Sequence, residues 1–129
     1  MSGPLVYIGT YTIKNGRLEE CKQRLGELVD LVETNEPRLM AFHVYLDEQG
    51  SKISVVQVHP DSESMEFHLK IVSEHLTGAF EYLETTESEQ LYGAPSETLA
   101  EMLQAYADPG IPVTFMPVHE VGFTRASVR

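Results

Sequence analysis

Cysteine, basic side chains and long apolar runs are all scarce in this sequence of 129 residues. The single cysteine, Cys21, excludes an internal disulfide and favours a reducing compartment. No apolar run approaches the roughly 20 residues that span a bilayer, so no membrane-spanning helix is expected. The first residues do not combine a basic segment with an apolar one, so we expect no signal peptide and predict a cytoplasmic location.

Positive charge is outweighed twofold, with 9 Lys and Arg against 20 Asp and Glu, a formal net charge of −11. Such a surface repels phosphate backbones and anionic lipid headgroups, so no nucleic-acid or membrane partner is expected. The composition is 42% hydrophobic and 22% charged, which is typical of a globular protein. The length suits one domain over residues 1–129, with a core that needs neither disulfides nor metal.

Two kinds of hydrophobic pattern alternate along the chain. Runs of β-branched and aromatic residues predict strands, over residues 5–13, 38–47, 52–59 and 111–124. Apolar residues at helical spacing predict helices, over residues 18–35, from 61 or 62 to about 78, and over 96–106. A turn of helix is predicted at 79–83. The acidic segment 84–95 is predicted to be a solvated loop, with a lid over a pocket as the alternative.

The resulting βαββαβ order predicts an α+β, ferredoxin-like domain with a four-stranded antiparallel sheet and helices on one face. Strand alternation indicates that the other face is also aromatic and apolar, with Tyr7, Tyr11, His43, Tyr45, Phe115 and His119. Such a face is not left in water, so we expect a second copy of the chain to cover it in a homodimer. The directions of Gln57 and His59 stay open, because they depend on the length of the turn after residue 47.

One segment has a more specific pattern. It reads His59-Pro60-Asp61-Ser62-Glu63-Ser64-Met65-Glu66-Phe67-His68-Leu69 and continues with Ser73-Glu74-His75-Leu76. This segment, in its βαββαβ context, is similar to the antibiotic biosynthesis monooxygenase family, whose members commonly have a polar cap and then a helix with two His residues two turns apart. The resemblance extends over residues 1–80 and the final strand. It implies a dimeric α+β barrel with one ligand cavity per subunit, between sheet and helices.

The same resemblance implies a range of activities. Some relatives oxidise quinols or polycyclic phenols with oxygen and no cofactor, and others have no known activity. Haem-degrading relatives use an Asn, a His and a Trp, and this sequence has no Trp, so that branch is disfavoured. The prediction is a cofactor-independent monooxygenase-like protein acting on a small aromatic or quinol substrate. The alternatives are a stress-responsive or small-ligand-binding barrel without catalysis, and a structural dimer without a ligand.

Oxygenation without a cofactor needs a base, donors for an oxyanion and a dry pocket. His68, on the apolar face of its helix, is predicted to be the catalytic base; a hydrogen-bonded core histidine is the alternative. The predicted substrate-binding residues are His43, Tyr45, Met65, Leu69, Val72, His75 and Phe115. No metal site is predicted: His43, His59 and His119 would have to face one cavity, and no HxH or HxxxH pair occurs.

Overall fold

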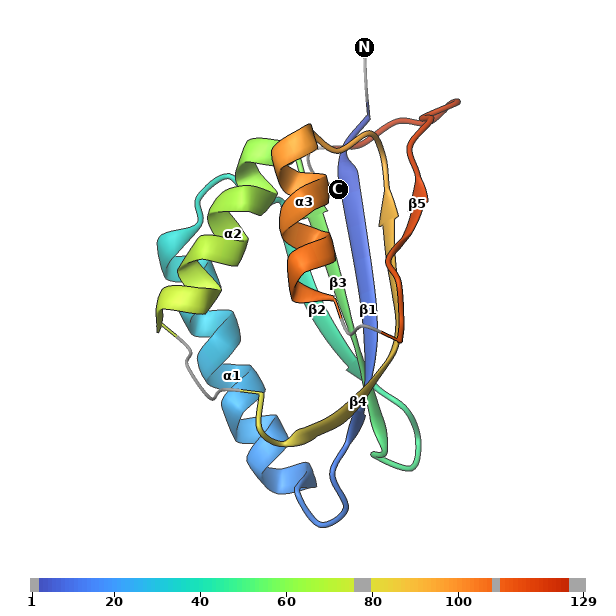
Figure 1. Cartoon of the computed structure of the whole chain (residues 1–129). Helices are drawn as coiled ribbons and strands as arrows, with labels where there is room; N and C mark the ends of the chain where they lie inside the picture. Colours follow the sequence, from blue (N-terminus) through green and yellow to red (C-terminus); the bar gives the residue numbers. More distant parts are fainter. Residues whose placement is uncertain (1–2, 76–79, 108–109, 126–129) are drawn as a thin grey trace.

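The computed structural model describes residues 3–75, 80–107 and 110–125. Its elements are β1 (Leu5–Ile13), α1 (Leu18–Asn35), β2 (Ala41–Leu46), β3 (Lys52–His59), α2 (Ser62–His75), β4 (Leu83–Tyr92), α3 (Glu97–Tyr106) and β5 (Thr114–Met116). The strands form one sheet in the order β2-β3-β1-β4-β5, and the three helices lie on the same face of it (Figure 1). Within the described residues, no helix combines the length and the apolar content needed to cross a membrane.

The sheet is mixed and five-stranded, whereas four antiparallel strands were predicted. The central strand β1 runs antiparallel to both neighbours, so Tyr7 lies between Gln57 of β3 and Leu91 of β4. β2 is antiparallel to β3, and the short β5 joins β4 in parallel. The α+β class is confirmed, and α3 corresponds to the helix predicted over residues 96–106. The strand that follows α2 is β4, which was not predicted, and only a short part of the predicted strand 111–124 forms β5.

The fourth strand lies where a loop was predicted. The acidic segment 84–95 forms most of β4, and of the predicted strand 111–124 only residues 114–116 pair with the sheet. β5 pairs only with Gln90–Tyr92, so the rest of β4 is an edge without a second strand partner among the described residues. Charged residues are typical of such edges because they block pairing with other chains. The described residues of the predicted helical turn at 79–83 form a turn that leads into β4.

Side-chain caps fix the starts of the two later helices. Asp61 caps α2, since its Oδ1 accepts the backbone N–H of Ser64 at 3.1 Å. Ser96 caps α3, since its Oγ accepts the N–H of Leu99 at 3.0 Å. The predicted end of α2 near Gly78 lies outside the described residues. The cap at Asp61, seven positions before His68, fixes where α2 begins.

Two apolar clusters form the core between the helices and the sheet. The first packs α1 against β1 and β3, and its buried members are Ile13, Cys21, Leu25, Leu28, Val32, Ile53, Val55 and Tyr82. The second packs α2 and α3 against β1 and β4, and its buried members are Leu5, Tyr7, Met65, Leu91, Leu99, Leu103 and Val113. Cys21 is a free, buried thiol as predicted, and burial raises its pKa, which disfavours the reactive thiolate.

The register decides which side chains face the helices. His43 lies opposite Val56, so Gln57 and His59 are buried on the helix-covered face. Tyr7 and Tyr11 share that face, because β1 alternates in step with β3. The prediction that both tyrosines lie on the open face is therefore wrong. It is also wrong for Phe115, which pairs with the buried Leu91 and packs against the cluster on the helix-covered side. The open face is less aromatic than predicted. Its apolar and aromatic residues include Val6, Ile8, Ala41, His43, Tyr45, Val56, Val58 and Tyr92, and polar residues such as Thr10, Ser54 and Gln90 lie among them.

Candidate functional site

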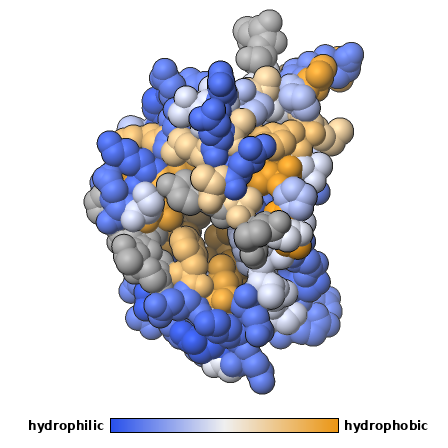
Figure 2. Space-filling view, in the orientation of Figure 1, coloured by the Kyte–Doolittle hydropathy of each residue, from blue (hydrophilic) through white to orange (hydrophobic). Residues whose placement is uncertain are grey.

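A cavity of about 640 Å³ lies between the helix-covered face of the sheet and the helices. Its walls are mainly apolar, and they include Leu25, Leu28, Phe42, Ile53, Val55, Leu69, Val72, Phe80, Leu83 and Leu103. Figure 2 shows a hollow with hydrophobic walls in a surface that is otherwise largely hydrophilic. A cavity of this size and polarity suits a small organic ligand.

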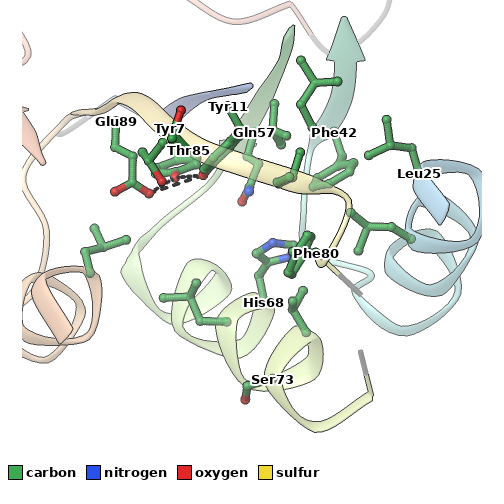
Figure 3. A pocket seen from close by; sticks show the side chains of 18 of the residues that line it. Tyr7, Tyr11, Leu25, Phe42, Gln57, His68, Ser73, Phe80, Thr85 and Glu89 are labelled. Atoms are coloured by element: carbon green, nitrogen blue, oxygen red, sulfur yellow. Dashed lines mark hydrogen bonds between the residues drawn. The ribbon is translucent and has the colours of Figure 1, made fainter. Parts of the chain in front are cut away.

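His68 enters this cavity from α2 (Figure 3). Its Nδ1 lies 2.9 Å from both carboxylate oxygens of Glu36, the residue that follows α1. Both side chains are nearly buried, with 5% and 2% of their surfaces exposed. Because a carboxylate only accepts, Nδ1 carries the hydrogen, and Nε2 has no partner within the described part of the chain. The contact with Glu36 therefore holds the His68 ring at the cavity wall and leaves Nε2 without a hydrogen-bond partner among the described residues.

A second polar group lies under the cavity, on β3 and the first turn of α2. His59 Nδ1 is 2.8 Å from Ser64 Oγ, and His59 Nε2 is 2.9 Å from Gln57 Oε1. Burial, and then the nearby His68, lower the pKa of His59 to about 3, against the opposing effect of Asp61. His59 is therefore neutral near neutral pH, and only Gln57 of this group lines the cavity.

A third polar group is formed by two tyrosines and a carboxyl group. The hydroxyl of Tyr7 is 2.7 Å from that of Tyr11 and donates to Glu89 Oε1 at 2.6 Å. Tyr11 also donates to this oxygen, at 3.3 Å. Burial is the main cause that raises the pKa of both tyrosines well above the usual value, so both stay neutral donors. Glu89 Oε2 is buried without a hydrogen-bond partner among the described residues.

The structure brings together only some of the predicted site residues. His68, Leu69 and Val72 line the cavity. Met65 is buried beside it in the second core cluster, and Phe115 packs against that cluster. The side chain of His75 lies outside the described residues.

His43 and Tyr45 require a correction. Both are exposed on the open face of the sheet, with 59% of Tyr45 accessible, so neither can contact a ligand in this cavity of their own chain. The sheet itself separates them from His68, because adjacent strand residues point to opposite faces. No group of His, Cys, Asp or Glu within the described ranges is arranged to hold a metal ion.

Nothing in the sequence pattern marked Glu36 or Glu89 as site residues. Glu36 precedes Pro37 at the end of a helix, where a carboxylate is ordinarily solvated, and its partner lies 32 positions away. Glu89 belongs to the acidic segment that resembled a loop. Tyr7 and Tyr11 did show a signal, since they alternate with Val6, Ile8 and Thr10, but alternation does not say which face is covered.

Comparison with known proteins supports the fold. No family model matches the chain, and no curated protein matches it in sequence. The crystal structure of MupZ from Pseudomonas fluorescens is 16% identical and covers 98% of this chain and 99% of its own, with a TM-score of 0.76. A mutant of SnoaB, described as a cofactor-independent oxygenase from Streptomyces nogalater, is 11% identical and covers 72% of this chain and 94% of its own, with a TM-score of 0.58.

A structure described as an antibiotic biosynthesis monooxygenase is 16% identical and covers 67% of this chain and 92% of its own, with a TM-score of 0.55. These shorter matches leave about a third of the chain uncovered, whereas the match to MupZ spans nearly all of it. Identities this low show a shared fold. The chain therefore has the fold of the antibiotic biosynthesis monooxygenase-like proteins, as its sequence predicted.

Proposed function

We propose that this protein is a cofactor-independent oxygenase that acts on a small phenol or quinol. The observation that carries the proposal is the Glu36–His68 pair, which presents Nε2 to an apolar cavity of about 640 Å³. A base held in one orientation, in a cavity with mainly apolar walls, can make an electron-rich phenolate. The shared fold with SnoaB, a cofactor-independent oxygenase, supports the same interpretation.

The reaction balances with molecular oxygen as the only co-substrate. His68 takes the phenol O–H proton, and the phenolate passes one electron to oxygen. The two radicals join at a free ring carbon to form a peroxide, which takes back the proton from His68. The O–O bond then breaks as the ring C–H proton is lost, leaving a carbonyl. In sum, the phenol and O₂ become a quinone and one water.

One observation favours a second candidate, a proton-transfer reaction that consumes no oxygen. Glu89 lines the same cavity as His68 but belongs to the sheet rather than to a helix. Two titratable groups that face one substrate can serve as an acid and a base. Substrate loss under nitrogen at the aerobic rate would support this candidate over oxygenation.

An oxygen electrode tests the main proposal. Purified protein is mixed with a panel of hydroquinones and polycyclic phenols, and oxygen uptake is compared with buffer. His68→Ala should lower the rate about 100-fold or more, because it removes the base. Lys70→Ala changes an exposed side chain on the same helix, α2, outside the cavity, and should leave the rate unchanged. A wild-type rate equal to buffer, or an equal loss in both variants, would refute the proposal for the panel.

We also propose that the protein forms a homodimer through the open face of the sheet. Val6, Ile8, Val56 and Val58 are only half-buried there, and Tyr45 is exposed. Beyond β5, Val118, Val121 and Phe123 each expose more than four-fifths of their surface. Apolar surface of this extent is typical of an interface. A two-fold partner of the same kind would cover it.

A further inference from the structure

We infer that Gln57 is the oxyanion donor of the cavity, and that His59 and Ser64 are the residues that position it. The inference rests on the proposed function, because it places the oxygen of a bound phenol between His68 and Gln57. Gln57, His59 and Ser64 are all buried. The hydrogen bonds between them are not needed to hold His68, which Glu36 orients.

The direction of the hydrogen bonds follows from the chemistry of each atom. Gln57 Oε1 only accepts, so the hydrogen in its 2.9 Å bond with His59 belongs to His59 Nε2. Neutral His59 then has no hydrogen on Nδ1, so Nδ1 accepts from Ser64 Oγ at 2.8 Å. The chain of donors therefore runs from Ser64 through His59 to the oxygen of Gln57. The Gln57 amide nitrogen keeps both hydrogens and has no partner in the described part of the structure.

Gln57 is placed to meet a substrate held by His68. It pairs across the sheet with Phe42 on one side and Tyr7 on the other, and all three line the cavity. Figure 3 shows Gln57 reaching from β3 toward the His68 imidazole, which comes from the opposite wall on α2. The ring centres of His59 and His68 are 5.8 Å apart, so the positioning residue and the base are near neighbours.

His59 keeps this arrangement fixed while the base changes charge. Its pKa of about 3 leaves it neutral whether or not His68 holds a proton, so the direction of the chain does not reverse during turnover. Hydrogen-bonded donors that are oriented in advance stabilise developing negative charge without reorganisation.

A purely structural network would satisfy both ends of the amide. In Gln57 the oxygen is bound by His59, whereas no hydrogen-bond partner of the nitrogen occurs among the described residues. The nitrogen is not one of the fully buried unpartnered atoms, so on this cavity-lining residue it is accessible to a ligand. A phenolate oxygen is the partner that this N–H donor fits.

Binding of p-nitrophenol tests the inference without any turnover. Its phenolate absorbs visible light, so a pH series with and without protein gives separate affinities for the neutral and anionic forms. The wild type should prefer the anion and so lower the pKa of the bound phenol. Gln57→Met, which removes the N–H donors, should weaken phenolate binding about tenfold to a hundredfold and neutral phenol less than about threefold.

Further variants guard against misfolding and general charge effects. Gln57→Glu keeps the acceptor for His59 but replaces the donors with an acceptor, so it should also abolish the preference. Gln23→Glu is the matched control, because it adds the same charge at an exposed position on α1, outside both the cavity and the open face of the sheet. Ser64→Ala should lose part of the preference and Ser64→Thr should restore it. Thermal melting checks that each variant is folded.

The outcomes separate this inference from the proposed function. A wild type with no preference for the anion, or a preference that survives in both Gln57 variants, would overturn the role of Gln57. If the preference depends on Gln57 but no quinol is oxidised, the inference stands and the oxygenase proposal fails. If quinol oxidation needs His68 while Gln57→Met and Gln57→Glu leave the preference intact, the oxygenase proposal stands and the inference fails.

Discussion

Nδ1 of His68 lies 2.9 Å from each carboxylate oxygen of Glu36, and this contact joins the middle of α2 to the end of α1. A buried carboxylate is costly to desolvate, so such a pair contributes little net stability and is better explained by orientation. The contact fixes which imidazole nitrogen carries the hydrogen, and it leaves the other nitrogen to the cavity. The ring of Phe42, 5.6 Å away between centres, limits the imidazole further.

Loss of the Glu36 carboxylate should destabilise the protein through its partner. In Glu36→Ala the buried Nδ1–H of His68 has no acceptor, so the free energy of unfolding should fall by about 1–3 kcal/mol. Glu36→Gln retains an acceptor oxygen and should lose less. Urea unfolding measures both. The control is Glu33→Ala, at an exposed position in the last turn of α1, which should change stability little. Equal losses at the two positions would contradict the pairing.

The neutral, buried His59 should make the protein less stable in mild acid. Its pKa is about 3 in the folded chain against 6.5 for the free group, so between these values the unfolded chain binds a proton that the folded chain does not. The contribution of neutral His59 to the free energy of unfolding is therefore full above pH 6.5. Below that it declines by up to about 1.4 kcal/mol per pH unit.

Urea unfolding across a pH series measures this slope. His59→Gln should be less stable than the wild type near neutral pH, but its stability should fall less steeply in acid, by about one proton. Lys70→Gln changes an exposed side chain on α2 and should keep the wild-type slope. An unchanged slope in His59→Gln would show that His59 takes up its proton equally well in the folded chain.

A charge on the open face should separate the proposed dimer. Val56 lies near the middle of that face, opposite His43 on β2 and Ile8 on β1. Val56→Asp would bury a carboxylate without a partner in the interface and should raise the dimer dissociation constant about 100-fold or more. Sedimentation should then show a shift from twice 14.5 kDa toward 14.5 kDa.

Thr98→Asp is the matched control for the dimer, because it adds the same charge at an exposed position on α3. It should leave the sedimenting mass unchanged. A wild-type protein that sediments at 14.5 kDa at micromolar concentration would itself remove the dimer proposal.

Local patterns in the sequence determined much of this protein. The helical spacing of apolar residues predicted α1 and α3 closely, and it placed Cys21 in the core and His68 on the buried side of α2. Such periods depend on neighbours within one or two turns, so they can be read from the chain alone. The α+β class follows from the order of the elements.

Only the tertiary structure decided how these elements meet. An acidic segment became β4 because it completes hydrogen bonding with β1, while most of the apolar segment 111–124 stayed unpaired. Tyr7 and Tyr11 faced the helices, and Glu36 met His68, because strand register and helix packing bring distant residues together. Those choices depend on which face and which edge is covered, and neither is encoded in the spacing of nearby residues.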